Sequence, residues 1–541
     1  MAYWLSDVAI TILRDNETLD DIATTRAGMI TGSNELFVRL WFEVSNTKSK
    51  YDCDSRGVAS ASRKVWFPYS KGGEYRKWYG NNDCVVDWEN DGFRMRNRKD
   101  EKGNIPAHAF NLEYIFRENV CWNSLSSNRF SARYTEKGYL YDAGGSFASP
   151  DSGESKILLG FLNSSVAFYY LSALNPTMNF QKGNVGNLPI IRVSGELKDR
   201  VQSLVEACIG ISTVDWDSFE YSWDFCTHPL VTYRSGAGYA DVPMDKCQYR
   251  IADAFHTWES NAEAQFDLLK KNEEELNRIF INIYGLQDEL TPEVGDKDIT
   301  VRKADLGRDI KSFISYSVGC MFGRYSLDVL GLAYAGGAWD DSKYSTFAAD
   351  KNNIIPISDD EYFEDDIVGR FVKFVGVVYG KETLQENLKF IADALGGNGQ
   401  PKEVIRNYFM NGFYTDHCKM YQKRPIYWMF DSGKKNGFKC LIYMHRYQPD
   451  TIARIRTDYV HEQQARYRTA IADLETRIAN ASTSEKVKLN KQLKILNDKA
   501  TEIHEYEEKI HHLADQMISI DFDDGVKKNY EIFKDVLAKI K

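Results

Sequence analysis

Residues 158–190, LLGFLNSSVAFYYLSALNPTMNFQKGNVGNLPI, change from apolar to polar and back to apolar. From Ile157 to Leu174 there is no charged residue, and this length lies at the lower limit for a membrane-spanning helix. The chain has no second such stretch, and four polar residues interrupt this one (Asn163, Ser164, Ser165 and Ser172). A buried helix is therefore the better prediction. The apolar residues Leu188–Val193 then indicate a short strand, so the stretch predicts a helix, a polar turn and a strand.

On the N-terminal side, residues 1–150 are rich in aromatic and β-branched residues, glycine and Asn/Asp turns. This composition predicts strands at 37–45, 64–70 and 84–90, with Gly-Gly and Gly-Asn-Asn-Asp as the turns between them. A polar loop at 94–104 follows.

The segment KVWFPYSKGGEYRKWYGNND (64–83) combines six aromatic residues with four cations. Such interleaving suits a surface that contacts phosphates with its cations and stacks bases on its rings. It equally suits a β-hairpin whose rings fill a core, because aromatic residues in strands are usually buried. The residues alone leave both interpretations open.

On the C-terminal side, amphipathic helices replace the strands. Apolar residues recur at helical spacing in four segments (196–212, 252–286, 309–327 and 382–395). Two heptad runs between Val460 and Leu513 flank Ser482 and Glu485, which form a capping-box signature, so an antiparallel helical hairpin is expected. Six acids crowd into residues 358–366, a pattern typical of a solvated loop.

These segments predict an α+β fold in three parts. A mixed β/α domain would span residues 1–195 and include the helix at 157–174, a helical or α+β domain would span 196–455, and a coiled-coil hairpin with a terminal helix would span 456–541.

Composition restricts the class of protein. A hydrophobic fraction of 43% and a charged fraction of 27% are typical of a globular protein without membrane spans. The net charge of −10 argues against nucleic-acid binding by bulk charge, although a local basic groove remains compatible with it. Nine scattered cysteines without a C-x-x-C pair indicate reduced thiols in a cytoplasmic protein, and no signal peptide is visible.

No self-sufficient active site is recognisable. An amino-methyltransferase of nucleic acid needs a glycine-rich turn for its methyl donor and an Asn/Asp-Pro-Pro-aromatic turn for the flipped base. The nearest sequence, Asn175-Pro176-Thr177-Met178, lacks the second proline and the ring. Gly396–Gly399 follows a predicted helix end and Gly336-Gly337 lies in a loop, so neither predicts a phosphate cradle. We therefore predict no catalytic residue and no metal site.

Several segments of the sequence resemble known protein families. Residues 158–190 resemble the helix–turn–strand signature of target recognition domains in restriction-modification specificity subunits and γ-class adenine methyltransferases. The matching positions are Asn163-Ser164, Asn179-Phe180-Gln181, Gly183, Val185 and Leu188-Pro189-Ile190. Residues 21–45, 66–92 and 315–328 and the terminal hairpin are similar to segments of the large adenine-specific DNA methyltransferases of BREX phage-defence systems, the PglX family. The resemblance covers nearly the whole chain.

The resemblance implies a detached recognition half, because the donor-binding glycines and the Asn-Pro-Pro-Tyr turn of that family are missing from this sequence. The expected partners are double-stranded DNA and a catalytic half or other BREX components. The cofactor S-adenosylmethionine is expected in the catalytic half and not in this chain. The predicted DNA contacts are Lys71, Arg76, Lys77, Trp78, Tyr79, Asn81, Asn82, Arg94, Arg96, Arg98, Gln181, Lys182, Lys434 and Lys435.

The last two cations belong to a second basic stretch at 420–456, which either closes over duplex DNA or forms a solvated strand pair packed on its own rings. Two other functional readings remain open. One is a scaffold that binds other defence components through the acidic loop and the hairpin. The other is a complete enzyme whose active site is not recognised.

Overall fold

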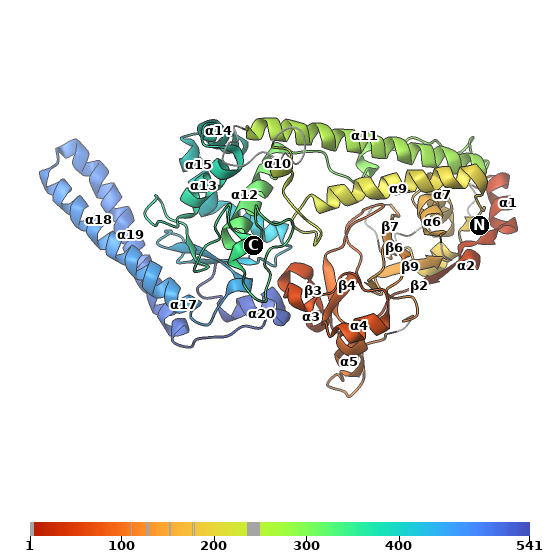
Figure 1. Ribbon diagram of the computed structural model, residues 1–541, viewed down its shortest axis with the longest axis horizontal. Coiled ribbons are helices and arrows are strands. Elements are labelled where there is room, and N and C mark those ends of the chain that lie inside the picture. Colours follow the sequence, from red (N-terminus) through yellow and green to blue (C-terminus); the bar gives the residue numbers. More distant parts are fainter. Residues whose placement is uncertain are drawn as a thin grey trace. The chain divides into compact units, whose positions relative to one another are not determined.

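The structure is a computed structural model that describes residues 5–109, 111–125, 129–150, 153–175, 177, 179–234 and 249–540. Pro176 and Met178 of the rejected Asn-Pro motif lie outside these residues. The chain forms two compact units. Unit 1 comprises residues 1–225 and 259–304, and unit 2 comprises residues 226–258 and 305–541. The long helix α11 (Ile251–Ile283) contributes its first residues to unit 2 and the remainder to unit 1 (Figure 1).

Unit 1 begins with short helices and strands and ends with long helices (Figure 1). In addition to α11 its main elements are α1 (Asp7–Asp15), β1 (Glu17–Thr18), α2 (Leu19–Ile22), β2 (Ala23–Arg26), α3 (Asn34–Phe37), β3 (Val38–Leu40), α4 (Arg56–Ser62), β4 (Trp66–Ser70), β5 (Cys84–Asp87), α5 (Glu89–Asn97), β6 (Asn119–Asn123), β7 (Ala132–Thr135), β8 (Leu140–Tyr141), β9 (Gly145–Pro150), α6 (Ser155–Leu162), α7 (Ser165–Leu174), α8 (Lys182–Gly186), β10 (Pro189–Ile190) and α9 (Gly195–Asp217).

Two four-stranded sheets organise the first half of unit 1. One has the order β2-β9-β6-β7 and is antiparallel throughout, and the other has the order β3-β5-β4-β8, with β4 and β8 parallel. The strands predicted at 64–70 and 84–90 are confirmed as β4 and β5, which pair antiparallel with Phe67 opposite Val86. The predicted strand at 37–45 is shorter than expected, because the chain leaves the sheet after Leu40 and forms a 3-10 turn at Trp41–Glu43.

The apolar stretch at 157–174 is two helices instead of the single predicted helix. The chain breaks at Asn163-Ser164, where the Asn163 side chain exchanges hydrogen bonds with the backbone of Ala132 and the Ser164 hydroxyl caps α7. No single helix in the described residues is long and apolar enough to cross a membrane. α6 and α7 meet that test only together, bent by 68°. Leu159, Leu162 and Ala167 are fully or almost fully buried in the core of unit 1.

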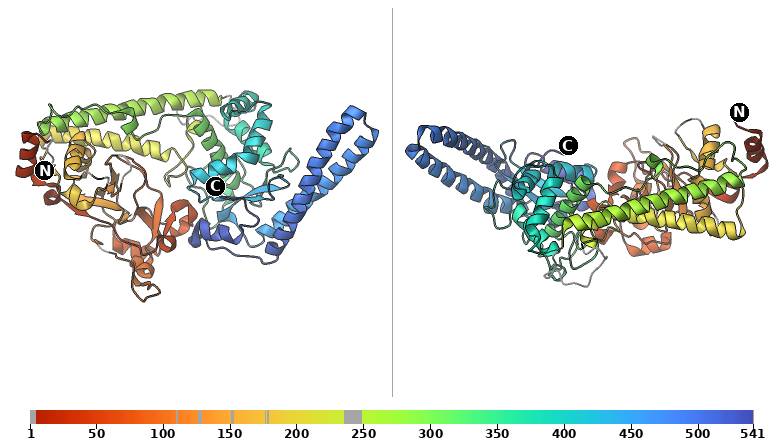
Figure 2. Two further views of the ribbon diagram at one scale, coloured as in Figure 1. Left: turned by 180° about the vertical axis from the view of Figure 1, so that it is seen from behind. Right: turned by 90° about the horizontal axis from the view of Figure 1, so that it is seen from above.

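The predicted helices at 196–212 and 252–286 are confirmed as α9 and α11, which lie side by side along unit 1 (Figure 2). Their apolar faces close over α6: Val201 and Val205 of α9 and Phe280 of α11 belong to the same buried core as Leu159. The helical spacing of apolar residues therefore marked the buried faces correctly.

Unit 2 is mainly helical. Its elements are α10 (Pro229–Thr232), α12 (Leu306–Phe322), β11 (Ile355–Pro356), α13 (Ile367–Tyr379), α14 (Leu384–Ala394), α15 (Pro401–Asn411), α16 (Phe413–Met420), β12 (Tyr427–Asp431), β13 (Lys439–Tyr443), α17 (Thr451–Arg454), a π-helical turn (Ile455–Val460), α18 (His461–Asn480), α19 (Thr483–Ala514) and α20 (Gly525–Ile532). A three-stranded sheet of order β11-β13-β12 lies within it. The helices predicted at 309–327 and 382–395 are confirmed as α12 and α14.

The terminal helical hairpin is confirmed as α18 and α19, whose two arms lie side by side in each view (Figures 1 and 2). Ser482 and Glu485 form the predicted capping box at the start of α19. Most acids of the segment 358–366 are exposed, as expected for a solvated loop, and two of them also pair with the hairpin: Asp359 with Lys499 and Asp360 with Arg466.

The mixture of small sheets and many helices confirms the predicted α+β class. The packing units differ in extent from the three predicted parts, since α9 packs within unit 1 and the hairpin belongs to unit 2. The division into domains at 1–195, 196–455 and 456–541 stays a prediction.

Candidate nucleic-acid interface

The segment 71–82, between β4 and β5, contains half of the predicted DNA contacts, and most of them are buried. Lys71 is exposed and Asn81 is half-buried. The exposed fraction is 7% for Arg76, 5% for Lys77 and 1% for Trp78. Tyr79 and Asn82 are also buried. These five side chains are not available to a DNA duplex in this structure, which corrects the prediction of direct contact for them.

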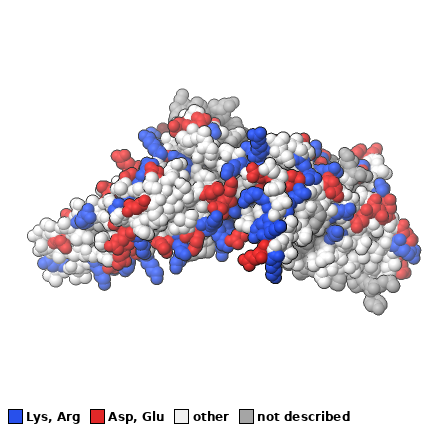
Figure 3. All heavy atoms as spheres, turned by 90° about the horizontal axis from the view of Figure 1, so that it is seen from below, with Lys and Arg blue, Asp and Glu red and all other residues white. Residues whose placement is uncertain are grey.

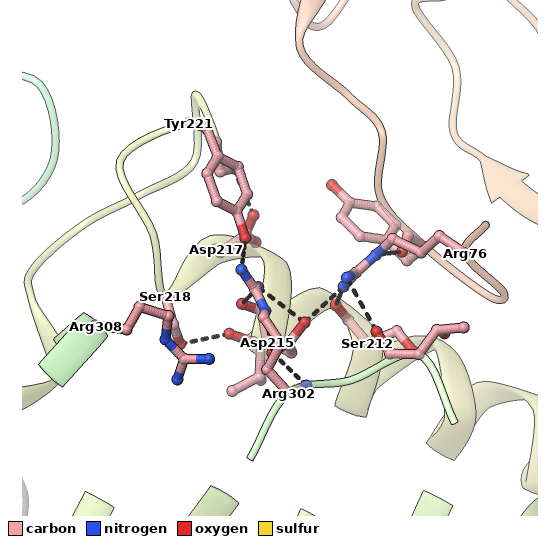
Figure 4. Close-up of polar contacts among 12 residues, drawn as sticks. Arg76, Ser212, Asp215, Asp217, Ser218, Tyr221, Arg302 and Arg308 are labelled. Carbon is pink, nitrogen blue, oxygen red and sulfur yellow. Dashed lines mark hydrogen bonds and ion pairs between the residues drawn. The ribbon is translucent and has the colours of Figure 1, made fainter. Parts of the chain in front are cut away.

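Arg76 lies in a buried ionic cluster at the end of α9 (Figure 4). Its Nη2 atom donates to the Asp215 carboxylate at 2.8 Å and to the Ser212 carbonyl at 3.1 Å. Arg302 binds the same carboxylate, with Nη2 at 2.9 Å and Nε at 3.1 Å. The guanidinium of Arg76 also lies over the Trp216 ring, at 4.9 Å from its centroid. One carboxylate thus holds two arginines from distant segments of unit 1.

The electrostatics of this cluster follow from burial and pairing. Burial raises the pKa of the Asp215 carboxyl, but Arg302 and Arg76 lower it more, so its pKa lies below the ordinary value. Two residues further on, burial raises the pKa of Asp217 to about 6, with the Ser222 hydroxyl opposing the shift and Asp224 adding to it. Asp215 is therefore a charged anchor, whereas Asp217 titrates near neutral pH.

A second buried pair holds the next two residues of the segment. Lys77 forms an ion pair with Glu273 of α11, and the indole Nε1 of Trp78 donates to the same carboxylate at 2.7 Å. Burial lowers the pKa of the Lys77 ammonium, but Glu273 and Tyr75 together raise it more, so its pKa lies above the ordinary value. Trp78 has a backbone φ of +71°, unusual for a bulky residue, and its backbone is bound on both sides by Ala132 and Tyr134. The segment is therefore rigidly attached to α9, α11 and the β2-β9-β6-β7 sheet.

Four of the exposed cations of unit 1 lie close together in the sequence on a different element. The basic protrusion, as we call residues 89–104, comprises α5 and the turn that follows it, and leaves the body of unit 1 below β4 and α4 (Figure 1). Seen from below, one cluster of Lys and Arg lies near the middle of the face, with Asp and Glu beside it (Figure 3). The exposed cations of the protrusion are Arg94, Arg96, Lys99 and Lys102, and Arg98 is half-buried.

Two of these cations also brace the protrusion. Arg94 pairs at 2.6 Å with Asp87, which is 1% exposed, while 60% of the Arg94 side chain remains accessible. Arg96 pairs at 2.6 Å with Asp91 and keeps 40% of its side chain accessible. Both guanidinium groups therefore have donors left for a phosphate or a base edge.

The remaining predicted contacts of unit 1, Gln181 and Lys182, are exposed at the start of α8. The backbone N–H of Gln181 donates to the side chain of Asn184 at 3.2 Å, and Gly186 packs against Asp20. Gly186 has no room for a Cβ atom there, because that atom would lie 2.4 Å from an Asp20 oxygen. The turn that carries Gln181 is thus closely fitted to α2.

The second basic stretch lies in unit 2, and most of its cations have protein partners. Lys435 pairs with Asp498, Lys439 with Asp431, and Arg456 with Glu507. Lys434 and Lys435 are exposed at the turn between β12 and β13. The rings of Tyr427, Trp428 and Tyr443 are completely buried. β12 and β13 form the predicted strand pair packed on its own rings, but the strands are buried and not solvated. Closure of this stretch over duplex DNA stays a prediction.

The described residues contain no group of three or more His, Cys, Asp or Glu side chains that is arranged to hold a metal ion. Gly396 follows the C-terminal end of α14 with φ of +76°, as expected for a helix cap. The residues missed by sequence reasoning are Asp215, Glu273 and Arg302, which anchor the segment 74–82. No local pattern marks them, because each is one charged residue on an ordinary helix or loop.

Comparison with known proteins gives two extensive matches. The chain is 44% identical over 539 residues to the adenine-specific methyltransferase PglX of Lacticaseibacillus casei (strain Zhang), which covers 98% of this chain and 44% of that protein. It is 37% identical over 545 residues to the adenine-specific methyltransferase BrxX of Escherichia coli O9:H4 (strain HS), which covers 94% of this chain and 42% of that protein. Identity at this level makes the chain homologous to both, and it spans less than half of their length.

No protein-family model matches the chain. Among solved structures, it aligns with the Type IIL restriction-modification enzyme MmeI in complex with DNA, over 51% of this chain and 34% of that one, with 11% identity and a TM-score of 0.32. This likeness is too weak to support an inference about function.

Proposed function

We propose that this chain supplies DNA sequence recognition to an adenine-specific DNA methyltransferase of a BREX-type phage-defence system. The observation that carries the proposal is the homology to PglX and BrxX over 98% and 94% of the chain. It is supported by the helix–turn–strand motif at 158–190 and by the basic protrusion of unit 1.

In this proposal, DNA recognition and methyl transfer belong to two different parts of a methyltransferase. This chain binds one DNA sequence, and a catalytic part binds S-adenosylmethionine, takes an adenine out of the duplex and transfers the methyl group to its N6 atom. The sequence in hand contains no donor-binding glycine turn and no Asn-Pro-Pro-aromatic turn, which supports assigning the transfer elsewhere.

The proposed DNA contacts are the exposed cations Lys71, Arg94, Arg96, Lys99, Lys102 and Lys182 and the half-buried Arg98, with Asn81 and Gln181 as candidates for base edges. The buried residues Arg76, Lys77 and Trp78 take the role of holding the segment 71–82 in a fixed position. Lys434 and Lys435 remain proposed contacts of unit 2.

The alternative function, a protein-binding scaffold, has less support in the structure. Its acidic segment is already engaged within unit 2, because Asp359, Asp360 and Glu361 pair with Lys499, Arg466 and Lys402. The hairpin α18–α19 is then the element on which this alternative depends.

The test is fluorescence anisotropy of the purified chain with labelled random-sequence duplex at several salt concentrations. Binding that weakens steeply with salt supports the proposal, and the slope counts the phosphates that are neutralised. Absence of binding at low salt, together with salt-insensitive association with other defence components, would favour the scaffold. Methyl transfer by this chain alone, lost in a point variant of it, would contradict the proposed division of labour.

A further inference from the structure

Phe93 is the most exposed aromatic side chain among the described residues, at 62%, and it lies in the basic protrusion. A single exposed apolar residue is common on protein surfaces and has no meaning by itself. Three further observations, on the backbone, on the ion pairs and on the neighbouring cations, distinguish this position.

The backbone before Phe93 adopts a rare conformation. Asn90, Asp91 and Gly92 have φ values of +49°, +62° and +71°, so three consecutive residues are left-handed. Glycine adopts this conformation readily, and Asn and Asp do so more often than other residues, but usually as single residues, so a run of three is uncommon. Gly92 packs against the ring of buried Trp88, where an added Cβ atom would lie 2.7 Å from the indole carbons. The turn is thus fitted closely to the body of unit 1.

Ion pairs hold this turn from outside. Arg56 of α4 binds the Asp91 carboxylate through Nε at 2.9 Å and Nη2 at 2.5 Å, and Arg96 binds it at 2.6 Å. The Asn97 side chain donates to the Phe93 carbonyl at 2.8 Å. Several interactions therefore fix this turn, and Phe93, which follows it, is directed away from the core.

Cations slightly outnumber acids around Phe93 in the sequence. Arg94 follows it directly and Arg96 lies three positions on, and Lys99 and Lys102 are exposed on the turn that follows α5. The acids of the protrusion are Glu89, Asp91, Asp100 and Glu101. An exposed apolar ring on an element that also exposes cations is the combination found in proteins that insert apolar wedges between base steps, which unstack and kink the duplex.

We propose that Phe93 is such a wedge and inserts between adjacent base pairs of the bound duplex. The inference rests on the proposed DNA-recognition function and adds a distortion of the DNA to it. The protrusion supplies the phosphate contacts on either side, and the fixed turn keeps the ring projecting before DNA arrives, so that little ordering is needed on binding.

The experiment starts from duplexes that the wild-type chain selects from a randomised pool. One selected duplex is then prepared with 2-aminopurine at successive positions, since this base fluoresces when it is unstacked. Wild-type protein is expected to raise the fluorescence at one base step. Phe93→Ala should abolish this rise and weaken binding about tenfold, without changing the salt dependence, because Phe93 neutralises no phosphate.

Two variants make the result specific. Phe93→Trp should restore the fluorescence rise, which excludes misfolding of the protrusion as the cause. Val214→Ala, which truncates another exposed apolar residue of unit 1 with 57% exposure, should behave as wild type.

An equal fluorescence rise with wild type and Phe93→Ala would overturn the wedge while leaving DNA recognition intact. Failure of the wild-type chain to select any duplex would overturn both. Loss of binding to anionic lipid vesicles in Phe93→Ala, with the DNA complex unchanged, would assign the ring to a lipid surface and overturn the wedge as well.

Discussion

The guanidinium of Arg76 lies 2.8 Å from the carboxylate of Asp215, although 139 positions of sequence separate the two residues. Only 9% and 8% of their side chains are accessible. Because a buried charge is tolerated only with a close partner, this pair requires the segment after β4 to lie against the end of α9. Arg302 pairs with the same carboxylate, so the segment after α11 must also lie against the end of α9.

Removing the shared carboxylate should destabilise unit 1 strongly. Asp215→Ala leaves Arg76 and Arg302 buried without their counter-charge, and we expect a loss of about 3–5 kcal/mol in the free energy of unfolding. Urea unfolding followed by tryptophan fluorescence measures it. The matched control is Asp296→Ala, which removes an exposed partner of Lys270 and should change the free energy of unfolding far less. Equal effects of the two variants would show that burial of the cluster contributes nothing.

Because of Asp217, the free energy of unfolding should fall as the pH rises from about 4 to about 6. Its pKa is raised to about 6, so the folded chain retains the proton that the unfolded chain releases near pH 4. Its ionisation therefore destabilises the folded state above pH 6 and has no effect below pH 4. Asp217→Asn should increase the free energy of unfolding by about 3 kcal/mol at pH 7 and by much less at pH 4. Urea midpoints at both pH values measure the difference.

The control for this titration is Asp199→Asn, which alters an exposed residue of the same helix. It should change stability equally little at both pH values. If Asp217→Asn has the same effect at pH 4 and pH 7, the Asp217 carboxyl is solvated and its ionisation is not coupled to folding.

Gly92 should tolerate substitution less well than another left-handed glycine of the same protrusion. Gly92→Ala combines an unfavourable φ of +71° with a Cβ atom 2.7 Å from Trp88, whereas Gly103→Ala has a φ of +82° and nothing within 4 Å. We expect about 1–2 kcal/mol of destabilisation for Gly103→Ala from the backbone alone, and more for Gly92→Ala. Thermal unfolding compares them. Equal losses would mean that Trp88 moves aside without cost.

The exposed lysines of the protrusion should contribute to the salt dependence of DNA binding. Lys99→Ala and Lys102→Ala should each lower the slope of log affinity against log salt by about one, because each removes one phosphate contact. Lys270→Ala removes a cation of α11 that is paired with Asp296, and it should leave the slope unchanged. Anisotropy titrations at three or more salt concentrations measure the slopes. An unchanged slope in both protrusion variants would place the DNA elsewhere.

Local patterns in the sequence were sufficient for the longest helices, for strands β4 and β5 and for the fold class. Helical spacing of apolar residues marked α9, α11, α12 and α14, and the capping box of Ser482 and Glu485 marked the start of α19. These features depend on interactions between residues a few positions apart, which the sequence displays directly. The break between α6 and α7 was missed because it depends on a hydrogen-bond exchange between Asn163 and Ala132, 31 positions away.

The tertiary structure alone decided which cations are available to a ligand. Arg76 and Arg94 look alike in the sequence, but Arg76 is buried against Asp215, whereas Arg94 keeps most of its side chain accessible beside Asp87. The difference comes from partners that folding brings in from distant segments, and no local pattern reports them. Residue types therefore identified a basic, aromatic region, and burial determined that its rings and half of its cations support the fold while the protrusion carrying Phe93 faces the solvent.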